Sequence, residues 1–215
     1  MKGLLLKDWY QVKTNMRMMY FTMLAVLAIW ILSTSGDSSF AVNYSAVFLG
    51  IMPAYLLSYD HASGWTEYSF ALPLSKELQV AEKYLVGLLC TAVSVALNGI
   101  FCGIRFWMGK PLPAMPIGLL LGAGAASILL INGIMLPLYY RFGAEKARML
   151  YMLMFAGMGA ALGGGAVMDE LQQNGTGSGP LPVPLWLAAV LLLAVLALYA
   201  VSWRVSVAWY GKYKK

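Results

Sequence analysis

Residues 183–205 read VPLWLAAVLLLAVLALYAVSWRV, a stretch of 23 residues in which Arg204 is the only charged side chain. A helix needs about 20 mostly apolar residues to cross a hydrocarbon core about 30 Å thick. A run this long is typical of a membrane span, because few soluble domains can bury it. Residues 183–205 therefore predict a transmembrane helix.

Five further apolar runs, each bounded by charged or turn-forming residues, precede this one. They cover residues 18–33, 41–59, 84–108, 115–140 and 149–168. The chain has 215 residues, of which 60% are hydrophobic and 11% charged, and a mean hydropathy of +0.71. This composition lies outside the usual balance of a soluble domain. We expect an all-α membrane protein with six transmembrane helices, forming a single domain over residues 1–215.

The basic residues fall mostly on one side of these six runs. Thirteen of the fifteen lysines and arginines lie in the two terminal segments and in the loops after the second and fourth runs, whereas Arg105 and Lys110 lie toward the other side. Cytoplasmic loops carry an excess of Lys and Arg. We therefore predict that both termini and residues 60–83 and 139–148 are cytoplasmic. The net charge of +6 then reflects topology and indicates no nucleic-acid partner.

The connections on the opposite side are short. They cover residues 34–40, 109–114 and 169–182, and the last of them, a predicted extracellular loop, contains the turn-forming stretch NGTGSGP. No small-residue cleavage pattern follows the first apolar run, so we expect no removable signal peptide.

Residues 1–17 predict an amphipathic helix that lies in the membrane interface. Four apolar residues at spacings of four, three and four share one helical face: Leu5, Trp9, Val12 and Met16. Three lysines lie away from this face: Lys2, Lys7 and Lys13. In such a helix Trp lies at headgroup depth and the lysines face anionic lipid. The alternative is a frayed basic tail before the first span.

The second cytoplasmic loop, residues 60–83, contains a predicted short helix. Trp65, Tyr68 and Leu72 follow a three-then-four spacing and would share one face, and Pro73 would end the helix. An aromatic face on a charged loop is suited to docking a partner. The alternative is an interfacial helix lying on lipid.

The third span is predicted to begin with a capped helix. Ser75 can act as its N-cap, and Glu77 is favourable in its first turn. The helix would then continue through Glu82 and Lys83 into the apolar run.

Residues that could carry catalysis are scarce. His61 is the only histidine, and the acids near it in sequence, such as Asp60 and Glu67, are predicted loop carboxylates. Cys90 and Cys102 lack the spacing of metal ligands, so we predict no metal site and no enzymatic activity.

A phosphate-binding loop needs Gly, four residues and then Gly-Lys-Ser/Thr. The nearest approach runs from Gly103 to Gly109, Lys110 and Pro111, with one residue too many and a proline in place of the hydroxyl. If ATP is used, a separate subunit must bind it.

Polar side chains inside predicted spans are costly and are functional candidates by default. Asn98 and Arg105 lie seven residues apart on nearly one face of the third span, and Asn132 lies within the fourth. We hypothesise that these three residues line a translocation path; ordinary interhelical hydrogen bonding is the alternative. Arg105 would snorkel outward or pair with an acid, for which the candidates are Asp37, Asp169 and Glu170.

Small and flexible residues cluster in the fourth and fifth spans. Two pairs of glycines have the four-residue spacing that lets helices approach closely, Gly118 with Gly122 and Gly159 with Gly163. Glycines 163–165 are candidates for breaking the fifth span near its outer end. The fourteen methionines would offer an adaptable surface to a peptide, among them Met16, Met18, Met19, Met149, Met152 and Met154.

Several short motifs resemble one family over nearly the whole chain. They are residues 1–8 (MKGLLLKD), Glu67, residues 72–75 (LPLS) and residues 82–84 (EKY), together with the six-span layout. With these the chain resembles the type-2 ATP-binding cassette permeases, in particular the small six-span bacterial permeases that export antimicrobial and phenol-soluble peptides with separate ATPases.

This resemblance implies a permease subunit in a bacterial cytoplasmic membrane that moves amphipathic peptides or other hydrophobic cargo outward. Residues 1–17 would be an elbow helix on the inner leaflet. Two permeases, identical or related, would pair above two ATPase subunits that bind ATP and Mg²⁺, while this chain holds no cofactor. A coupling helix in residues 60–83 would be seated in a groove of the ATPase, its contacts being Trp65, Glu67, Tyr68, Leu72 and Pro73.

The main alternative is a self-sufficient secondary transporter or channel. That class predicts ionisable residues near the middle of spans and repeated halves. The span centres contain no acid, and residues 1–110 and 111–215 show no convincing repeat. The sequence therefore favours the permease.

Overall fold

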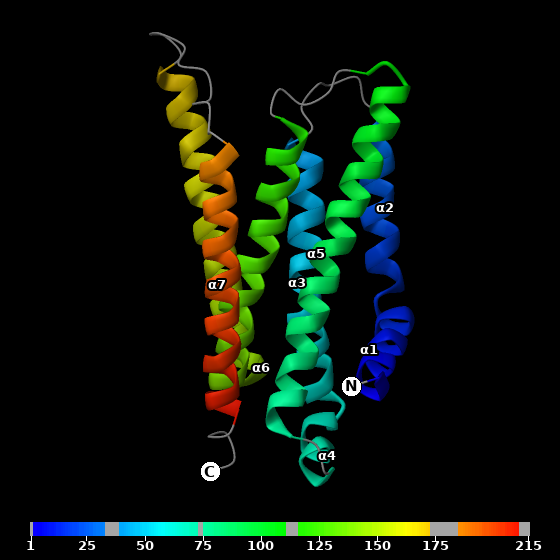
Figure 1. Ribbon diagram of the computed structural model, residues 1–215, viewed down its shortest axis with the longest axis vertical. Helices are drawn as coiled ribbons and strands as arrows, with labels where there is room; N and C mark the ends of the chain where they lie inside the picture. The colour runs from blue at the N-terminus through cyan, green and yellow to red at the C-terminus, as the bar shows by residue number, and fades with distance from the viewer. Residues whose placement is uncertain (1, 33–38, 73–74, 111–115, 173–184, 211–215) are drawn as a thin grey trace.

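The computed structural model of the chain describes residues 2–32, 39–72, 75–110, 116–172 and 185–210. All regular structure within these ranges is helical, which confirms the predicted all-α class. Its long helices run side by side, and α1 and α4 lie at the same end of the bundle (Figure 1). The helices are α1 (Lys2–Asn15), α2 (Arg17–Leu32), α3 (Ser39–Ala62), α4 (Trp65–Ala71), α5 (Lys76–Trp107), α6 (Ile117–Gln172) and α7 (Leu185–Tyr210).

Three of these helices contain segments that are long and apolar enough to cross a membrane, among the residues that the structure describes. They are Lys76–Trp107, Ile117–Gly143 and Val190–Tyr210. The described parts of the other three predicted spans are also helical, but α2, at 16 residues, is only about 24 Å long at 1.5 Å per residue. Six spans therefore stays a prediction.

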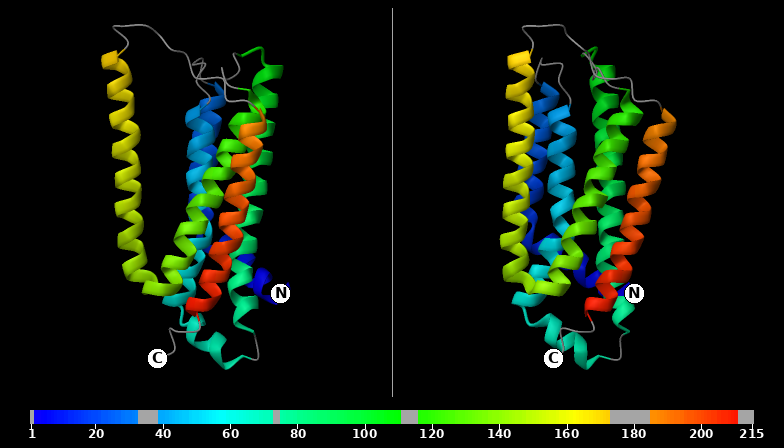
Figure 2. Two further views of the ribbon diagram at one scale, coloured as in Figure 1. Left: turned by 60° about the vertical axis from the view of Figure 1, so that its left-hand side comes forward. Right: turned by 90° about the vertical axis from the view of Figure 1, so that its left-hand side faces the viewer.

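The helix α6 consists of two helices joined at one residue. Gly143 has φ 79° and ψ 172° within an otherwise helical run, and glycine adopts a positive φ at little cost. The chain reverses there, so that the second part of α6 runs back along the bundle (Figure 2). The predicted cytoplasmic loop at 139–148 is thus a one-residue turn with helix on both sides, and its cytoplasmic location stays a prediction.

The second part of α6 also extends further than predicted. It continues without interruption through glycines 163–165 to Gln172, so the predicted break in the fifth span is absent. The first four residues of the predicted extracellular loop, 169–172, are helical. Residues 173–182 of that loop lie outside the described residues.

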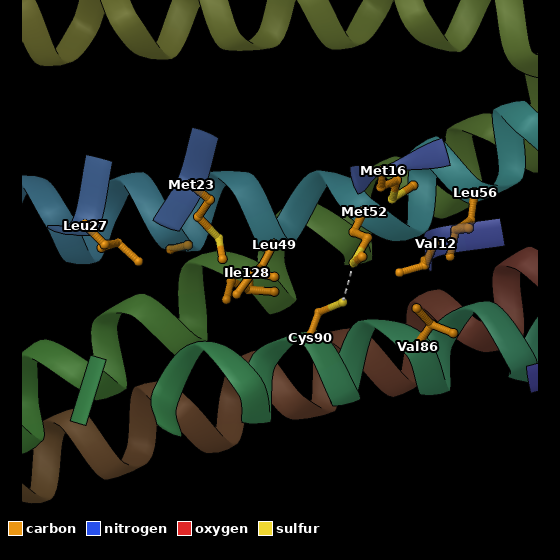
Figure 3. Close-up of a cluster of buried hydrophobic side chains, with 11 residues drawn as sticks. Val12, Met16, Met23, Leu27, Leu49, Met52, Leu56, Val86, Cys90 and Ile128 are labelled. Carbon is orange, nitrogen blue, oxygen red and sulfur yellow. Dashed lines mark hydrogen bonds between the residues drawn. The ribbon is translucent and has the colours of Figure 1, made fainter. Parts of the chain in front are cut away.

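The main apolar core joins α2, α3 and α5 (Figure 3). Leu27 and Leu56 are fully buried in it, and Cys90 Sγ lies 3.4 Å from Met52 Sδ. Flexible thioethers fill irregular gaps between helices well. Val12 and Met16 belong to the same core, so the end of α1 is anchored on the bundle.

The face that α1 buries in the bundle overlaps only in part with the predicted interfacial face. Trp9 is 65% exposed, and its place in the membrane interface stays a prediction. The buried residues instead follow a constant spacing of four: Leu4, Asp8, Val12 and Met16. The ion pairs of Asp8, described below, account for the rotation, because an ionised carboxylate in the interior needs its partners.

The contact between α6 and α7 is built around a proline. Pro137 has no N–H, so the carbonyl of Gly133, four residues earlier, loses its donor within the helix. The hydroxyl of Ser202 on α7 donates to that carbonyl. An unsatisfied carbonyl is expensive in hydrocarbon, so this bond both permits the proline and holds α7 against α6.

Candidate functional site

The short helix α4 lies where the aromatic spacing predicts it. Gly64 precedes it with φ 71°, and Ser69 Oγ donates to the carbonyl oxygen of Thr66 at 2.8 Å. The helix ends at Ala71, and the next residue, Leu72, has the extended backbone (ψ 147°) that is favoured before proline. Pro73 itself lies outside the described residues. The role of α4 in coupling stays a prediction.

Two sides of α4 have different surroundings. The half-buried Trp65 faces the bundle, where Lys7 Nζ lies 4.6 Å from the centroid of its ring. The ring of Tyr68 lies 5.5 Å from that of Trp65 but is 58% exposed, and Glu67 is exposed as well. Two of the three residues of the predicted face are therefore together on α4, with Trp65 held by α1 and Tyr68 accessible, whereas Leu72 lies beyond the end of the helix.

One glutamine links α4 to both α5 and α7. Gln79 Nε2 on α5 donates to the carbonyl oxygen of Ser69 at 3.3 Å, and its Oε1 accepts from the hydroxyl of Tyr210 at the end of α7. The start of α5 is fixed as predicted, because Ser75 Oγ accepts the backbone N–H of Leu78 at 3.3 Å. These bonds give α4 a defined position on the bundle.

Behind α4 lies a buried group of charged residues, here called the charge cluster: Lys7, Asp8, Asp60, Glu82 and Lys83. Lys83 Nζ lies 2.8 Å from the Asp8 carboxylate and 2.7 Å from that of Asp60. Lys7 Nζ lies 2.8 Å from Asp60 and 3.2 Å from Asp8. The cluster thereby ties α1, α3 and α5 together.

Charge in this cluster is unbalanced, with three carboxylates and two ammonium groups. Glu82 is 4% exposed, its Oε1 has no hydrogen-bond partner, and its nearest cation, Lys83 Nζ, is 3.9 Å away. Glu82 and Lys83 both precede residue 84, where the third predicted span begins, so they lie at its cytoplasmic end in the predicted topology. Burial raises the pKa of Glu82 to about 7; Lys83 offsets part of that rise and Asp8 adds to it.

The pKa of Lys83 is raised as well, and for an amine a raised pKa favours the charged form. Burial alone would lower the pKa of Lys83, but Asp60 and Asp8 outweigh it, and the pKa is raised. Lys83 is therefore the fixed positive centre of the charge cluster, and Glu82 is its weakest anion.

A pocket of about 70 Å³ connects the cluster to α4 and to the reversal of α6. A cavity of this size can hold water. Besides Gly143, its walls include Asp60, Trp65, Glu82, Tyr139, Tyr140 and Tyr210. Residues of α1, α3, α4, α5, α6 and α7 therefore meet around this pocket.

The three predicted path residues do not share one site. Asn98 is buried and donates to Ser45 Oγ on α3 at 2.7 Å, which favours the alternative of interhelical hydrogen bonding. Asn132 packs beside Gly87, and Gly87 lies 11 residues from Asn98, about 16 Å along α5. Their role on a path stays a prediction.

Arg105 is fully buried and lies on the same buried side of α5 as Asn98. The prediction that it snorkels outward is therefore wrong. The side chains of its predicted acidic partners, at positions 37, 169 and 170, lie outside what the structure describes.

Sequence reasoning missed the charge cluster. It placed Asp60 in a loop, whereas Asp60 is a buried residue at the end of α3, and it assigned Lys7 to lipid. One signal was available, because Leu4, Asp8 and Val12 share a spacing of four that places the acid within an apolar stripe. The pairing of Asp8 with Lys83, 75 residues apart, leaves no local signal.

A comparison with protein families matches residues 3–211 to the model of the ABC-2 family transporter protein. Comparisons with curated proteins and with solved structures give no significant match.

Proposed function

Since the chain belongs to the ABC-2 transporter family and is thus a membrane permease subunit of an ABC transporter, we propose that it is the permease of an exporter whose separate ATPase subunit docks on α4. One observation carries this proposal. Glu67 and Tyr68 are exposed on α4, while Trp65 and Ser69 of the same helix are tied to α1, α5 and, through Gln79, to α7.

The coupling would pass through these ties. ATP-driven movement of the partner would displace α4, and with it Trp65, Lys7 and the charge cluster. Because the cluster joins α1, α3 and α5, the three helices would move together. The ATP and Mg²⁺ belong to the partner subunit.

The proposed cargo is an amphipathic peptide or another hydrophobic molecule. It would cross through a cavity between two permease copies, identical or related, that opens alternately to each side. Exposed methionines on two helices would offer the cargo an adaptable apolar surface, namely Met18 on α2 with Met149 and Met152 on α6.

The proposed location is a bacterial cytoplasmic membrane, with both termini inside. The start of α1, the helix α4, the turn at Gly143 and the end of α7 share one end of the bundle (Figure 1, Figure 2), as this topology requires. A cysteine introduced at Asn174 should react only with a reagent added from outside. Labelling from the cytoplasm would overturn the topology.

The first test of the docking proposal is purification of the tagged permease from its native membrane in mild detergent. We expect mass spectrometry to find a cassette ATPase in a one-to-one ratio. A permease that purifies without any ATPase would instead favour a secondary transporter or channel.

The second test uses exposed residues, so that folding is preserved. The double variant Glu67→Ala, Tyr68→Ala should abolish stimulation of the ATPase by the permease without reducing membrane insertion. Trp65→Ala should also weaken the stimulation of the ATPase, because it releases α4 from its contact with Lys7. The matched control is Phe106→Ala, which removes an exposed aromatic side chain at the opposite end of α5. Unchanged stimulation in the double variant would refute docking on α4.

Cargo is tested with the reconstituted complex in vesicles. ATP should drive transport of a labelled amphipathic helical peptide but not of a scrambled peptide of the same composition. Equal rates for both peptides would contradict the proposed cargo class.

A further inference from the structure

An apolar groove lies between α7 and the first part of α6. It has a volume of about 330 Å³. Its walls include Ile134, Pro137 and Leu138 of α6 and Leu198, Val201 and Val205 of α7. Both Leu198 and Val201 are 59% exposed, so the groove is open to the surroundings of the bundle.

In the membrane these surroundings are lipid. Both walls belong to segments that are apolar and long enough to span, Ile117–Gly143 and Val190–Tyr210. The α7 wall of the groove runs from Leu198 to Trp209, a separation of eleven residues or about 16 Å of helix. That length is close to the depth of one leaflet, about half of a 30 Å core.

The end of the groove toward α4 is closed by a cation and an aromatic ring. Arg141 lies one turn beyond Pro137 on the same face of α6, and its Cζ is 4.8 Å from the ring centroid of Trp209, a residue of the groove wall. The Phe142 ring is 5.2 Å from the same guanidinium carbon. Within the described ranges, no carboxylate lies at ion-pair distance from Arg141.

The sequence around this end is basic. Residues 141–148 contain three basic residues, Arg141, Lys146 and Arg148, against one acid, Glu145. Trp at headgroup depth beside an arginine is a typical anchor at a membrane interface. An arginine fork matches phosphate oxygens in a bidentate manner. The end of the groove therefore has the charge and the donors for a phosphate group.

We propose that this groove binds one anionic phospholipid of the cytoplasmic leaflet, with an acyl chain along Pro137 and Val201 and the phosphate on Arg141. The site is independent of ATPase docking and of the direction of transport, because it lies on the α6–α7 face and uses no residue of α4.

Native mass spectrometry of the purified permease tests the proposal. The protein is exchanged into detergent with phosphatidylglycerol or phosphatidylcholine of identical acyl chains. We expect retention of one phosphatidylglycerol in preference to phosphatidylcholine. Arg141→Gln should lower the phosphatidylglycerol-bound fraction about fivefold, the effect of one basic residue at an anionic surface.

The matched control is Arg204→Gln, which removes an exposed arginine of α7 that stacks on Trp203 and does not line the groove. It should retain phosphatidylglycerol as the wild type does. Equal loss in both variants, or equal retention of the two lipids by the wild type, would overturn the proposal in favour of non-specific lipid around the bundle.

A second variant tests the acyl-chain part of the site. Val201→Trp fills the groove at an exposed position and should reduce retention of phosphatidylglycerol while Arg141 is unchanged. Inorganic phosphate at millimolar concentration should not displace the lipid. Displacement by phosphate, or full retention in Val201→Trp, would show that the groove does not hold the chain.

Discussion

The polar contacts at the α4 end of the bundle differ in kind from those in its middle. At the α4 end, ion pairs join residues 53 and 75 positions apart in sequence. In the middle, four polar side chains donate to the carbonyl four residues earlier in their own helix: Thr91 to Gly87, Asn98 to Ser94, Ser127 to Ala123 and Asn132 to Ile128. The side-chain bonds that cross between helices there are neutral hydrogen bonds, such as Asn98 to Ser45 and Ser202 to Gly133.

This difference has a mechanical meaning. A side chain that bonds to its own helix is satisfied in hydrocarbon without a neighbour, and it leaves the neighbouring helix free to shift. An ion pair between helices fixes their relative position. The α4 end is therefore a junction held by ion pairs, whereas the helices in the middle of the bundle are joined by neutral hydrogen bonds.

The largest expected effect comes from removing the centre of the junction. Lys83→Met leaves three carboxylates with only Lys7, and breaking a buried ion pair from one side costs about 3–5 kcal/mol. Thermal unfolding in detergent should show a large loss of stability. Lys76→Met, which removes an exposed lysine from the same helix, should leave the midpoint nearly unchanged. Similar midpoints for Lys83→Met and the wild type would contradict the junction.

A smaller effect, dependent on pH, is expected at Glu82. Its pKa is about 7 in the folded protein, above the value of an unfolded glutamate, so the folded state favours the protonated form. The contribution of Glu82 to stability is then fully present below about pH 4.5 and is lost as the pH rises through about 7, by on the order of 3 kcal/mol.

Glu82→Gln should flatten this profile and raise the unfolding temperature at pH 8. Glu77→Gln, which removes an exposed carboxylate of α5, controls for the loss of a charge as such. A wild-type profile that is flat between pH 5 and 8 would refute the assignment to Glu82.

The smallest effects are expected in the middle of the bundle. Asn98→Ala removes the bond to Ser45 on α3 and should cost about 1 kcal/mol, as interhelical hydrogen bonds in membranes do. Thr91→Val removes only a bond to its own helix and should cost less than half as much. Unfolding in detergent checks both, and an equal loss in the two variants would remove the distinction between bonds that join two helices and bonds within one helix.

The sequence predicted the fold better than the site, for a physical reason. Helices, the cap at Ser75 and the aromatic spacing of α4 follow from neighbours a few residues apart, and these predictions hold. The turn at Gly143 was hidden because nothing local distinguishes a single glycine with positive φ from a longer loop. Asp8, Asp60 and Lys83 meet only after three helices pack, so their burial follows from tertiary structure.

The single-residue turn at Gly143 allows the second part of α6 to tilt as one rigid helix about that glycine. Residues 144–172 form a helix about 43 Å long at 1.5 Å per residue, joined to the first part of α6 through the torsion angles of one glycine. A tilt of about 10° at this pivot would carry the far end of the helix by about 7 Å. Since Gly143 and Glu82 line the same pocket, a sub-ångström adjustment beside the charge cluster would be amplified at the opposite end of the bundle.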